Sequence, residues 1–268
     1  MTHVIITGGS SGIGLAVARV WLGRGAKVSL LARRQSVLTL ACESLKPLAG
    51  PDAERLFCHP ADVMDVANLE AAIRACEAAL GPCDVLVTSA GIVEPQAFDA
   101  MGADVFDAQI STNFLGTVHA VRAVYPAMKR RGEGQIMMIS SAAAFIGIHG
   151  YTAYCASKSA LRGFAEALRG EALAHGVSVS IAYPPDTLTP QYEAEIGKRS
   201  PEAAALMGQL KPWPAERVAV HIVSAIDRRR KELFFGPSLM ALGFFGPFIK
   251  PALFWLAQRK LIRRKTVR

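Results

Sequence analysis

Three residues in the second half of the chain have side chains suited to delivering a proton to a carbonyl oxygen. Tyr154 and Lys158 are four residues apart, and Ser141 precedes the tyrosine by thirteen residues. Positions i and i+4 of a helix share one face, so the phenol and the ammonium can point into the same cleft. A neighbouring cation favours the phenolate and so eases proton transfer. We expect Tyr154 to be the acid and Lys158 to lower its pKa, the alternative being a surface Tyr and Lys at helical spacing.

A glycine-rich turn near the N-terminus favours the functional interpretation of this pair. Apolar residues 3–7 predict a buried strand, and an apolar helix is expected over residues 15–22. A strand, a glycine turn and a helix together form a dinucleotide-binding motif, in which backbone N–H groups and the helix N-terminus hold the pyrophosphate. A glycine turn without function is the alternative. The turn residues expected to contact a dinucleotide are Gly8, Ser10, Ser11, Gly12, Ile13 and Gly14.

Two arginines follow the second predicted strand, residues 27–32. Arg33 lies nineteen residues after Gly14, where an NAD-specific protein places an acid for the ribose hydroxyls. Arg33 and Arg34 would instead suit a 2′-phosphate. We therefore expect the cofactor to be NADPH/NADP+.

Together these motifs resemble those of the classical short-chain dehydrogenase/reductase family. The resemblance covers about residues 1–236, and it implies that Ser141 polarises the substrate carbonyl, that Lys158 also binds the nicotinamide ribose and that Asn113 holds a water in a proton relay. The family's Asn-Asn-Ala-Gly segment is Thr88-Ser89-Ala90-Gly91 here. This difference puts in doubt the bond that braces the fourth strand in the family. The further cofactor contacts implied by the resemblance are Asp62, Val63, Ala90, Gly91, Pro184, Thr187 and Thr189.

A narrower resemblance concerns the loop after the sixth predicted strand. The segment 182–190, Ala-Tyr-Pro-Pro-Asp-Thr-Leu-Thr-Pro, is similar to the corresponding segment of 3-ketodihydrosphingosine reductases, as are the paired serines Ser140-Ser141. This resemblance implies an NADPH-dependent reduction of the 3-keto group of a long-chain amino ketone. In that case Asp186 could bind the substrate ammonium, with Glu193 and Glu195 as weaker candidates. The alternative is that Asp186 caps or turns the start of the next segment.

The alternation of apolar strands and amphipathic helices predicts an α/β fold. We expect a single Rossmann-type, doubly wound parallel sheet with helices on both faces, since 268 residues suit one core. The predicted long helices cover residues 103–131 and 151–175. Residues 190–214 depart from the alternation and are interpreted as a lid over the substrate, or else as an ordinary surface excursion. The predicted strands are residues 3–7, 27–32, 55–58, 84–89, 135–140, 177–182 and 232–235.

The C-terminal segment, residues 237–268, is apolar and then basic. Residues 238–257 carry a single charge, Lys250, and six basic residues without an acid follow from Arg259 onward. Twenty apolar residues can span a bilayer, but Gly243, Gly246, Pro247 and Pro251 are expected to interrupt a helix. We therefore expect a monotopic or re-entrant anchor with its basic end on anionic headgroups. A transmembrane span and a soluble dimerisation flap are the alternatives.

Composition excludes several other classes. The six terminal cations leave a net charge of only 8 − 6 = +2 for the rest of the chain, which disfavours a nucleic-acid binder. Five cysteines form no Cys-x-x-Cys pair and six histidines lack ligand spacing, so neither a disulfide framework nor a metal site is expected. No basic region followed by an apolar stretch precedes the first predicted strand, so no secretory leader is expected. We expect a cytoplasmic protein on the cytoplasmic face of a membrane, with a homodimer or homotetramer possible.

Two other functions compete with this interpretation. A membrane-associated reductase of the same family could act on a β-ketoacyl, retinoid or steroid carbonyl with the same chemistry. A non-catalytic NADPH-binding sensor or scaffold at the membrane is the alternative from another class. The intact set of Asn113, Ser141, Tyr154 and Lys158 disfavours the sensor, because binding alone requires no acid.

Overall fold

Seven strands form one parallel sheet, in the order β3-β2-β1-β4-β5-β6-β9. The computed structural model describes residues 1–207 and 211–266, without the side chains of Asp52 and residues 260–266. The predicted parallel sheet is confirmed, and each predicted strand lies within two residues of the observed one. The strands are β1 His3–Thr7, β2 Lys27–Ala32, β3 Leu56–Pro60, β4 Val85–Thr88, β5 Gly134–Ile139, β6 Val177–Tyr183 and β9 Glu232–Phe234.

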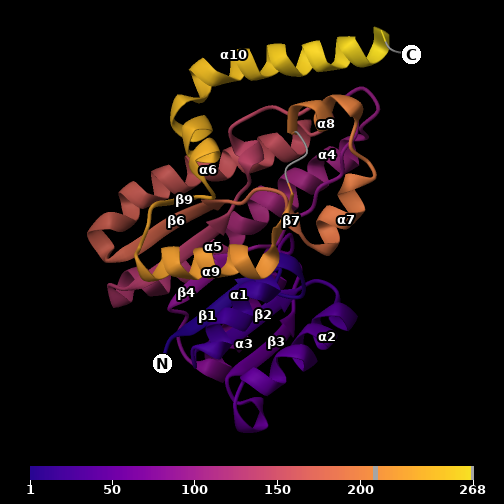
Figure 1. Cartoon of the computed structure of the whole chain (residues 1–268). Coiled ribbons are helices and arrows are strands. Elements are labelled where there is room, and N and C mark those ends of the chain that lie inside the picture. The colour runs from indigo at the N-terminus through magenta and orange to yellow at the C-terminus, as the bar shows by residue number, and fades with distance from the viewer. Residues whose placement is uncertain (208–210, 267–268) are drawn as a thin grey trace.

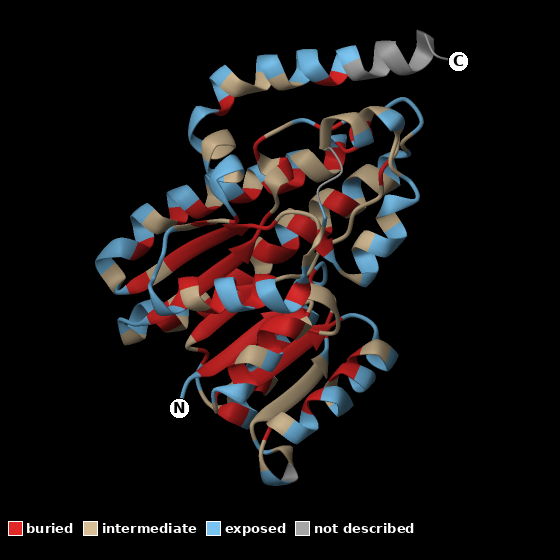
Figure 2. Ribbon diagram, viewed as in Figure 1, coloured by how far each residue is buried: buried red, intermediate tan, exposed pale blue. Residues whose placement is uncertain are grey.

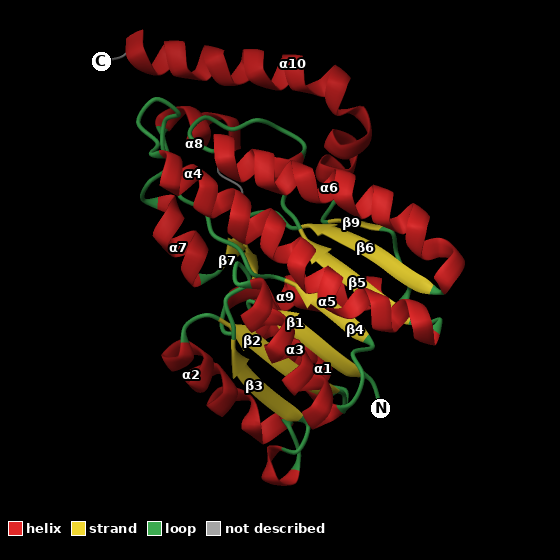
Figure 3. Cartoon of the chain, turned by 180° about the vertical axis from the view of Figure 1, so that it is seen from behind, coloured by secondary structure: helices red, strands yellow, loops and turns green. Residues whose placement is uncertain are grey.

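Helices cover both faces of this sheet (Figures 1 and 3), because its central strands are apolar on both sides. One face packs against α1 Gly12–Gly23, α2 Gln35–Leu45 and α9 Ala215–Asp227. The other face packs against α3 Val66–Leu80, α5 Gly116–Arg131 and α6 Thr152–Ala172. Figure 2 shows the buried sheet lying between helices whose outer faces are exposed. The doubly wound fold is therefore confirmed.

The long helix predicted over residues 103–131 contains an irregular turn. It comprises α4 Ala103–Ile110, a π-helical segment Ser111–Leu115 and then α5. Such π segments interrupt the regular i→i−4 bonding of a helix and are frequent at functional sites. Asn113 lies in this segment. The other long helix is α6, which ends in a 3₁₀ turn, Leu173–His175.

The predicted lid, residues 190–214, is a small helical excursion. It contains α7 Pro190–Ile196 and α8 Pro201–Met207, while its residues 208–210 lie outside the described part of the chain. Two short strands, β7 Thr187–Leu188 and β8 Trp213–Pro214, pair in parallel on either side of the helices. This pairing joins the two ends of the excursion and holds it over the carboxyl ends of the sheet strands.

The C-terminal segment is a single helix, α10 Pro237–Thr266. The expectation that its glycines and prolines interrupt the helix was wrong, because Pro247 and Pro251 lie inside it. Each proline removes one backbone hydrogen bond, and the helix bends instead of ending: in Figure 1 it turns soon after its start and then passes above α8. The basic side chains of residues 260–268 lie outside the described part of the structure.

Candidate active site

The glycine turn between β1 and α1 packs closely against neighbouring backbone. Gly8 has φ +69°, and a Cβ at this position would lie 2.5 Å from the backbone nitrogen of Ala90. A Cβ on Gly14 would collide with the carbonyl oxygen of Gly8. The N-cap residue Ser11 makes no side-chain hydrogen bond to the first turn of α1. The first N–H groups of α1 therefore have no side-chain cap and are suited to an anion.

A cavity of about 650 Å³ opens beside this turn, and we call it the nucleotide cavity. Gly14 supports the turn without lining the cavity, and Pro184 and Thr187 lie elsewhere. The residues predicted to contact a dinucleotide that do line it are Gly8, Ser10, Ser11, Gly12, Ile13, Arg33, Arg34, Asp62, Val63, Ala90, Gly91, Tyr154, Lys158 and Thr189. The glycine cradle and these side chains fit an extended dinucleotide.

Arg33 lies at the end of β2, on the wall of the nucleotide cavity. Its Nη1 is 3.7 Å from Oδ2 of Asp62, and its side chain is 61% exposed. Arg34 is also exposed and lines the same wall. An exposed, loosely paired guanidinium can reorient toward an incoming phosphate.

Lys158 lines the floor of this cavity, Asn113 lies buried behind it, and hydrogen bonds hold both side chains in place. Nζ of Lys158 donates to the carbonyl oxygen of Ile139 at 3.0 Å. The amide of fully buried Asn113 accepts from the N–H of Ile92 at 2.7 Å and donates to Oγ of Ser157 at 3.0 Å. Asn113 thus fixes the segment after β4 against α6, and its side chain does not line the cavity.

Burial controls the charge of the central pair. Burial raises the pKa of Tyr154 well above its ordinary value, while the Ser141 hydroxyl lowers it. Burial also lowers the pKa of Lys158 to about 8. The lysine Nζ lies 5.7 Å from the centre of the tyrosine ring. Burial is the largest influence on the Tyr154 pKa, and it acts against the lowering expected from Lys158.

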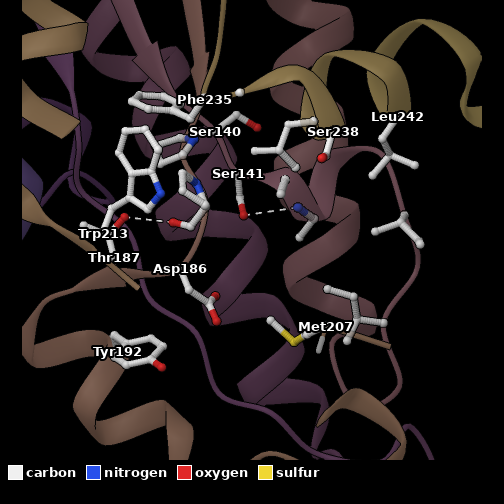
Figure 4. Close-up of a pocket in the computed structure, with 18 of the residues that line it drawn as sticks. Ser140, Ser141, Asp186, Thr187, Tyr192, Met207, Trp213, Phe235, Ser238 and Leu242 are labelled. Atoms are coloured by element: carbon white, nitrogen blue, oxygen red, sulfur yellow. Dashed lines mark hydrogen bonds between the residues drawn. The ribbon is translucent and has the colours of Figure 1, made fainter. Parts of the chain in front are cut away.

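A second cavity, of about 470 Å³, lies on the other side of Tyr154, and we call it the substrate cavity. Figure 4 shows Ser141 and Asp186 between apolar walls, with Trp213 and Phe235 on one side and Met207 and Leu242 on the other. Oγ of Ser141 accepts from the N–H of Ala143 at 3.2 Å, which leaves the hydroxyl proton available. Pro184 and Thr187 line this second cavity.

The two cavities share a wall at Tyr154. Five residues line both of them: Ile13, Ser140, Tyr154, Thr189 and Gln191. Lys158 lines the nucleotide cavity, and Ser141 lines the substrate cavity. The Tyr154 phenol therefore lies between the two cavities, where ligands bound in each of them can come into contact.

Asp186 lines the substrate cavity but has a partner within the chain. Its Oδ2 and Oδ1 accept from the Arg199 guanidinium at 2.7 and 3.0 Å. Arg199 also donates to Glu195, and Glu195 accepts from the Tyr151 hydroxyl at 2.6 Å. The sequence expectation for Asp186 did not include this pairing.

Several residues of the site were missed by sequence reasoning. Gln191 and Tyr151 line the cavities without belonging to a motif, and Arg199 reaches the site from the segment between α7 and α8. Ser140 was quoted only as part of a serine pair, although its hydroxyl donates to the Lys158 carbonyl at 2.9 Å. The predicted lid, residues 190–214, includes Gln191 and Arg199, but no sequence signal indicated Tyr151.

Comparisons with known proteins agree with this geometry. A family model described as short chain dehydrogenase matches residues 2–199. A 3-dehydrosphinganine reductase of Danio rerio is 41% identical over 237 residues, which are 88% of this chain and 71% of that protein. A 3-ketodihydrosphingosine reductase of Bos taurus is 38% identical over 222 residues, 82% and 67% of the two chains. The crystal structure of a levodione reductase matches with a TM-score of 0.79 and 26% identity, covering 87% of this chain and 94% of that one.

Proposed function

The chain belongs to the short-chain dehydrogenase family, and on that basis we propose that it reduces the 3-keto group of 3-ketodihydrosphingosine to dihydrosphingosine with NADPH. The observation that carries this proposal is the meeting of the two cavities at Tyr154. The similarity to 3-dehydrosphinganine and 3-ketodihydrosphingosine reductases supports the choice of substrate.

The reduction requires a hydride on the keto carbon and a proton on its oxygen. A bound nicotinamide cofactor supplies the hydride. Tyr154 donates the proton, and its raised pKa keeps the phenol protonated at neutral pH. The Ser141 hydroxyl donates a hydrogen bond to the same oxygen. The phenolate that remains is stabilised by the ammonium of Lys158, and Asn113 keeps the adjoining segment in place.

NADPH is proposed over NADH because of the charge at the end of β2. Arg33 and Arg34 line the nucleotide cavity at the position where an NAD-specific protein has an acid. Such an acid would repel a 2′-phosphate. Guanidinium groups form strong, charge-assisted bonds to phosphate. Asp62 contacts Arg33 only at 3.7 Å, so this carboxylate leaves the arginine free to turn.

The substrate cavity is suited to the polar end of a lipid. A chain of some sixteen carbons resists transfer through water by more than about 10 kcal/mol, at roughly 0.8 kcal/mol per methylene. Leu239, Leu242 and Leu253 of α10 form one apolar wall of the cavity. The headgroup would enter the cavity while the hydrocarbon chain lies along this wall and in lipid.

We propose that α10 associates with the cytoplasmic face of a membrane. Residues Pro237–Arg259 form, among the described residues, one helix long and apolar enough to cross a bilayer, with mean hydropathy 1.5 and only 6% of the apolar window buried. Its exposed apolar residues are Met240, Phe244, Phe245, Phe248, Phe254, Trp255 and Leu256. Because its first turns also line the substrate cavity, we favour a helix lying at the surface over a full span.

Turnover in detergent micelles tests the proposed function. NADPH oxidation with 3-ketosphinganine should exceed oxidation with a β-ketoacyl thioester, a retinal or a ketosteroid by at least tenfold in kcat/KM. A preference for one of the other carbonyls would assign the chain to a different reductase. Cofactor binding without turnover of any of them would instead support a sensor or scaffold.

A further inference from the structure

The substrate cavity contains an ion network with more acid than base. Arg199 lies between Asp186 and Glu195, and their side chains are 9%, 30% and 11% exposed. Two carboxylates and one guanidinium leave this group with one net negative charge. Lys211 also lines the cavity, but it is exposed and forms no ion pair with described residues. A cation that completes the group stabilises such a partly buried excess charge.

The two carboxylates differ in how their oxygens are used. Both oxygens of Asp186 accept from Arg199, in a bidentate pair. All the hydrogen bonds of Glu195 fall on Oε1, which accepts from the Tyr151 hydroxyl at 2.6 Å and from Nε and Nη2 of Arg199 at 3.0 and 2.9 Å. Among the described residues, Oε2 of Glu195 has no hydrogen-bond partner. This oxygen belongs to a residue that lines the substrate cavity.

We propose that Glu195, oriented by Arg199 and Tyr151, binds the ammonium group of the amino-ketone substrate through Oε2. This inference rests on the proposed function and names the group that selects the amine. The role expected for Asp186 is thereby assigned to Glu195. Asp186 positions Arg199, and Arg199 positions Glu195. The incoming ammonium would bring the charge of the network to zero.

The location of Glu195 suits the structure of the substrate. The amine of the substrate is one carbon from the reacting ketone, so its partner must lie close to the proton donor. The ring of Tyr151, whose hydroxyl holds Glu195, is 6.2 Å from the ring of Tyr154. The negative charges of Glu195 and Asp186 also contribute to the raised pKa of Tyr154, after the larger effect of burial. The carboxylates are therefore near the phenol that protonates the ketone.

The test compares two ketones that differ only at the amine. The full-length protein in detergent micelles, with saturating NADPH, is given 3-ketosphinganine and the analogue with a hydroxyl in place of the amine. Glu195→Gln keeps the size and the Oε1 acceptor but removes the charge. We expect it to lower kcat/KM for the amino ketone at least tenfold, mainly through KM, and to change kcat/KM for the hydroxyl analogue less than threefold. The matched control is Glu166→Gln, the same substitution at an exposed residue of α6 that lines neither cavity, and it should alter kcat/KM for neither ketone.

Each other outcome has a distinct meaning. Equal losses with both ketones would overturn the inference, and so would a selective loss in Asp186→Asn but not in Glu195→Gln. Wild-type protein that reduces neither ketone would overturn the proposed function. Binding of sphinganine to the NADP+-loaded protein, measured by calorimetry, gives a readout independent of turnover: Glu195→Gln should weaken it at least tenfold. Unchanged sphinganine binding would overturn the role of Glu195.

Discussion

Tyr154 and Lys158 lie at the junction of the two cavities, where Lys158 is buried and Tyr154 is half-buried. Burial disfavours the charged form of each, raising the pKa of the phenol and lowering that of the ammonium to about 8. At neutral pH the phenol is therefore a proton donor, and the lysine still carries its charge. This is the protonation state that a carbonyl reduction needs at its start.

Replacing the phenol hydroxyl should abolish turnover and spare cofactor binding. Tyr154→Phe keeps the ring that lines both cavities and removes the transferable proton. General acids commonly contribute 10² to 10⁴-fold, so kcat should fall by about that factor while the Kd for NADPH changes by a few-fold. Steady-state kinetics and fluorescence titration measure the two quantities. More than about a tenth of wild-type turnover would exclude Tyr154 as the acid.

The lowered pKa of Lys158 predicts a pH-dependent stability difference. The unfolded chain holds the lysine proton up to about pH 10.4, whereas the folded chain loses it near pH 8. Between these values the unfolded state binds more protons, so the free energy of unfolding rises with pH through this group. The stability of the ligand-free wild type minus that of Lys158→Met should increase by about 1–3 kcal/mol from pH 8 to pH 10. Urea unfolding at several pH values measures this difference, and a flat difference would contradict the buried, desolvated lysine.

Cofactor choice is expected to depend on Arg33. Arg33→Asp places a negative charge on the wall of the nucleotide cavity and should lower the preference for NADPH over NADH at least tenfold, about 1.4 kcal/mol. The ratio of kcat/KM for the two cofactors measures it. An unchanged ratio would mean that the phosphate is held by other groups, such as Arg34 or Ser10.

The residues that sequence reasoning identified share one property: a short segment fixes their surroundings. Gly8, Gly12 and Gly14 belong to one turn, and Tyr154 and Lys158 to one helix face. Arg199 and Glu195 could not be assigned in this way, because their meaning depends on Asp186, thirteen residues before Arg199, and on Tyr151 in another segment. The tertiary packing of residues 186–199 beside Tyr151 brings these groups together, and no local spacing encodes it.

Among the secondary-structure elements, the strands were easier to predict from the sequence than the C-terminal helix α10. Buried parallel strands are continuous apolar runs bounded by polar turns, which the sequence shows directly. The π-helical segment at Ser111–Leu115 leaves no such pattern. The two prolines inside α10 are four residues apart. Each removes one backbone hydrogen bond, and the helix bends as a result.

The outer face of α10 provides the test of membrane association. Removal of the helix after Gly236 would also remove Leu239 and Leu242 from the substrate cavity, so substitutions are more informative. Phe245 and Phe248 are 59% and 83% exposed and line neither cavity. The double variant Phe245→Gln, Phe248→Gln should bind anionic vesicles at least tenfold more weakly, since burying each ring in lipid contributes about 1.5–3 kcal/mol.

The control for this experiment is an exposed apolar residue remote from α10. Leu40 of α2 is 71% exposed, and Figures 1 and 3 show α2 at the opposite end of the molecule. Leu40→Gln should leave vesicle binding unchanged, and turnover in micelles should stay within about twofold for both variants. Equal vesicle sedimentation of the double variant and the wild type would place the contact surface elsewhere.

For the whole molecule, charge and apolar surface lie at the same end of the chain. The C-terminal basic run carries six of the eight net positive charges, and in the sequence it directly follows the apolar part of α10. Salt should therefore weaken vesicle binding without eliminating it, because the apolar contact is not screened. If this surface instead contacts a second copy of the chain, the molecular mass measured in detergent should increase with protein concentration.

Thr189, the N-cap residue of α7, lines both cavities and its hydroxyl accepts from the Tyr192 N–H. A Cβ on Gly12 would lie 3.0 Å from the methyl group of Thr189. The segment that shapes the lipid site thus rests on the glycine turn that shapes the dinucleotide site. Two ligands that share such a wall are thermodynamically coupled, and the coupling is reciprocal. We therefore expect bound dinucleotide to change the affinity for the lipid by the same factor as bound lipid changes the affinity for the dinucleotide.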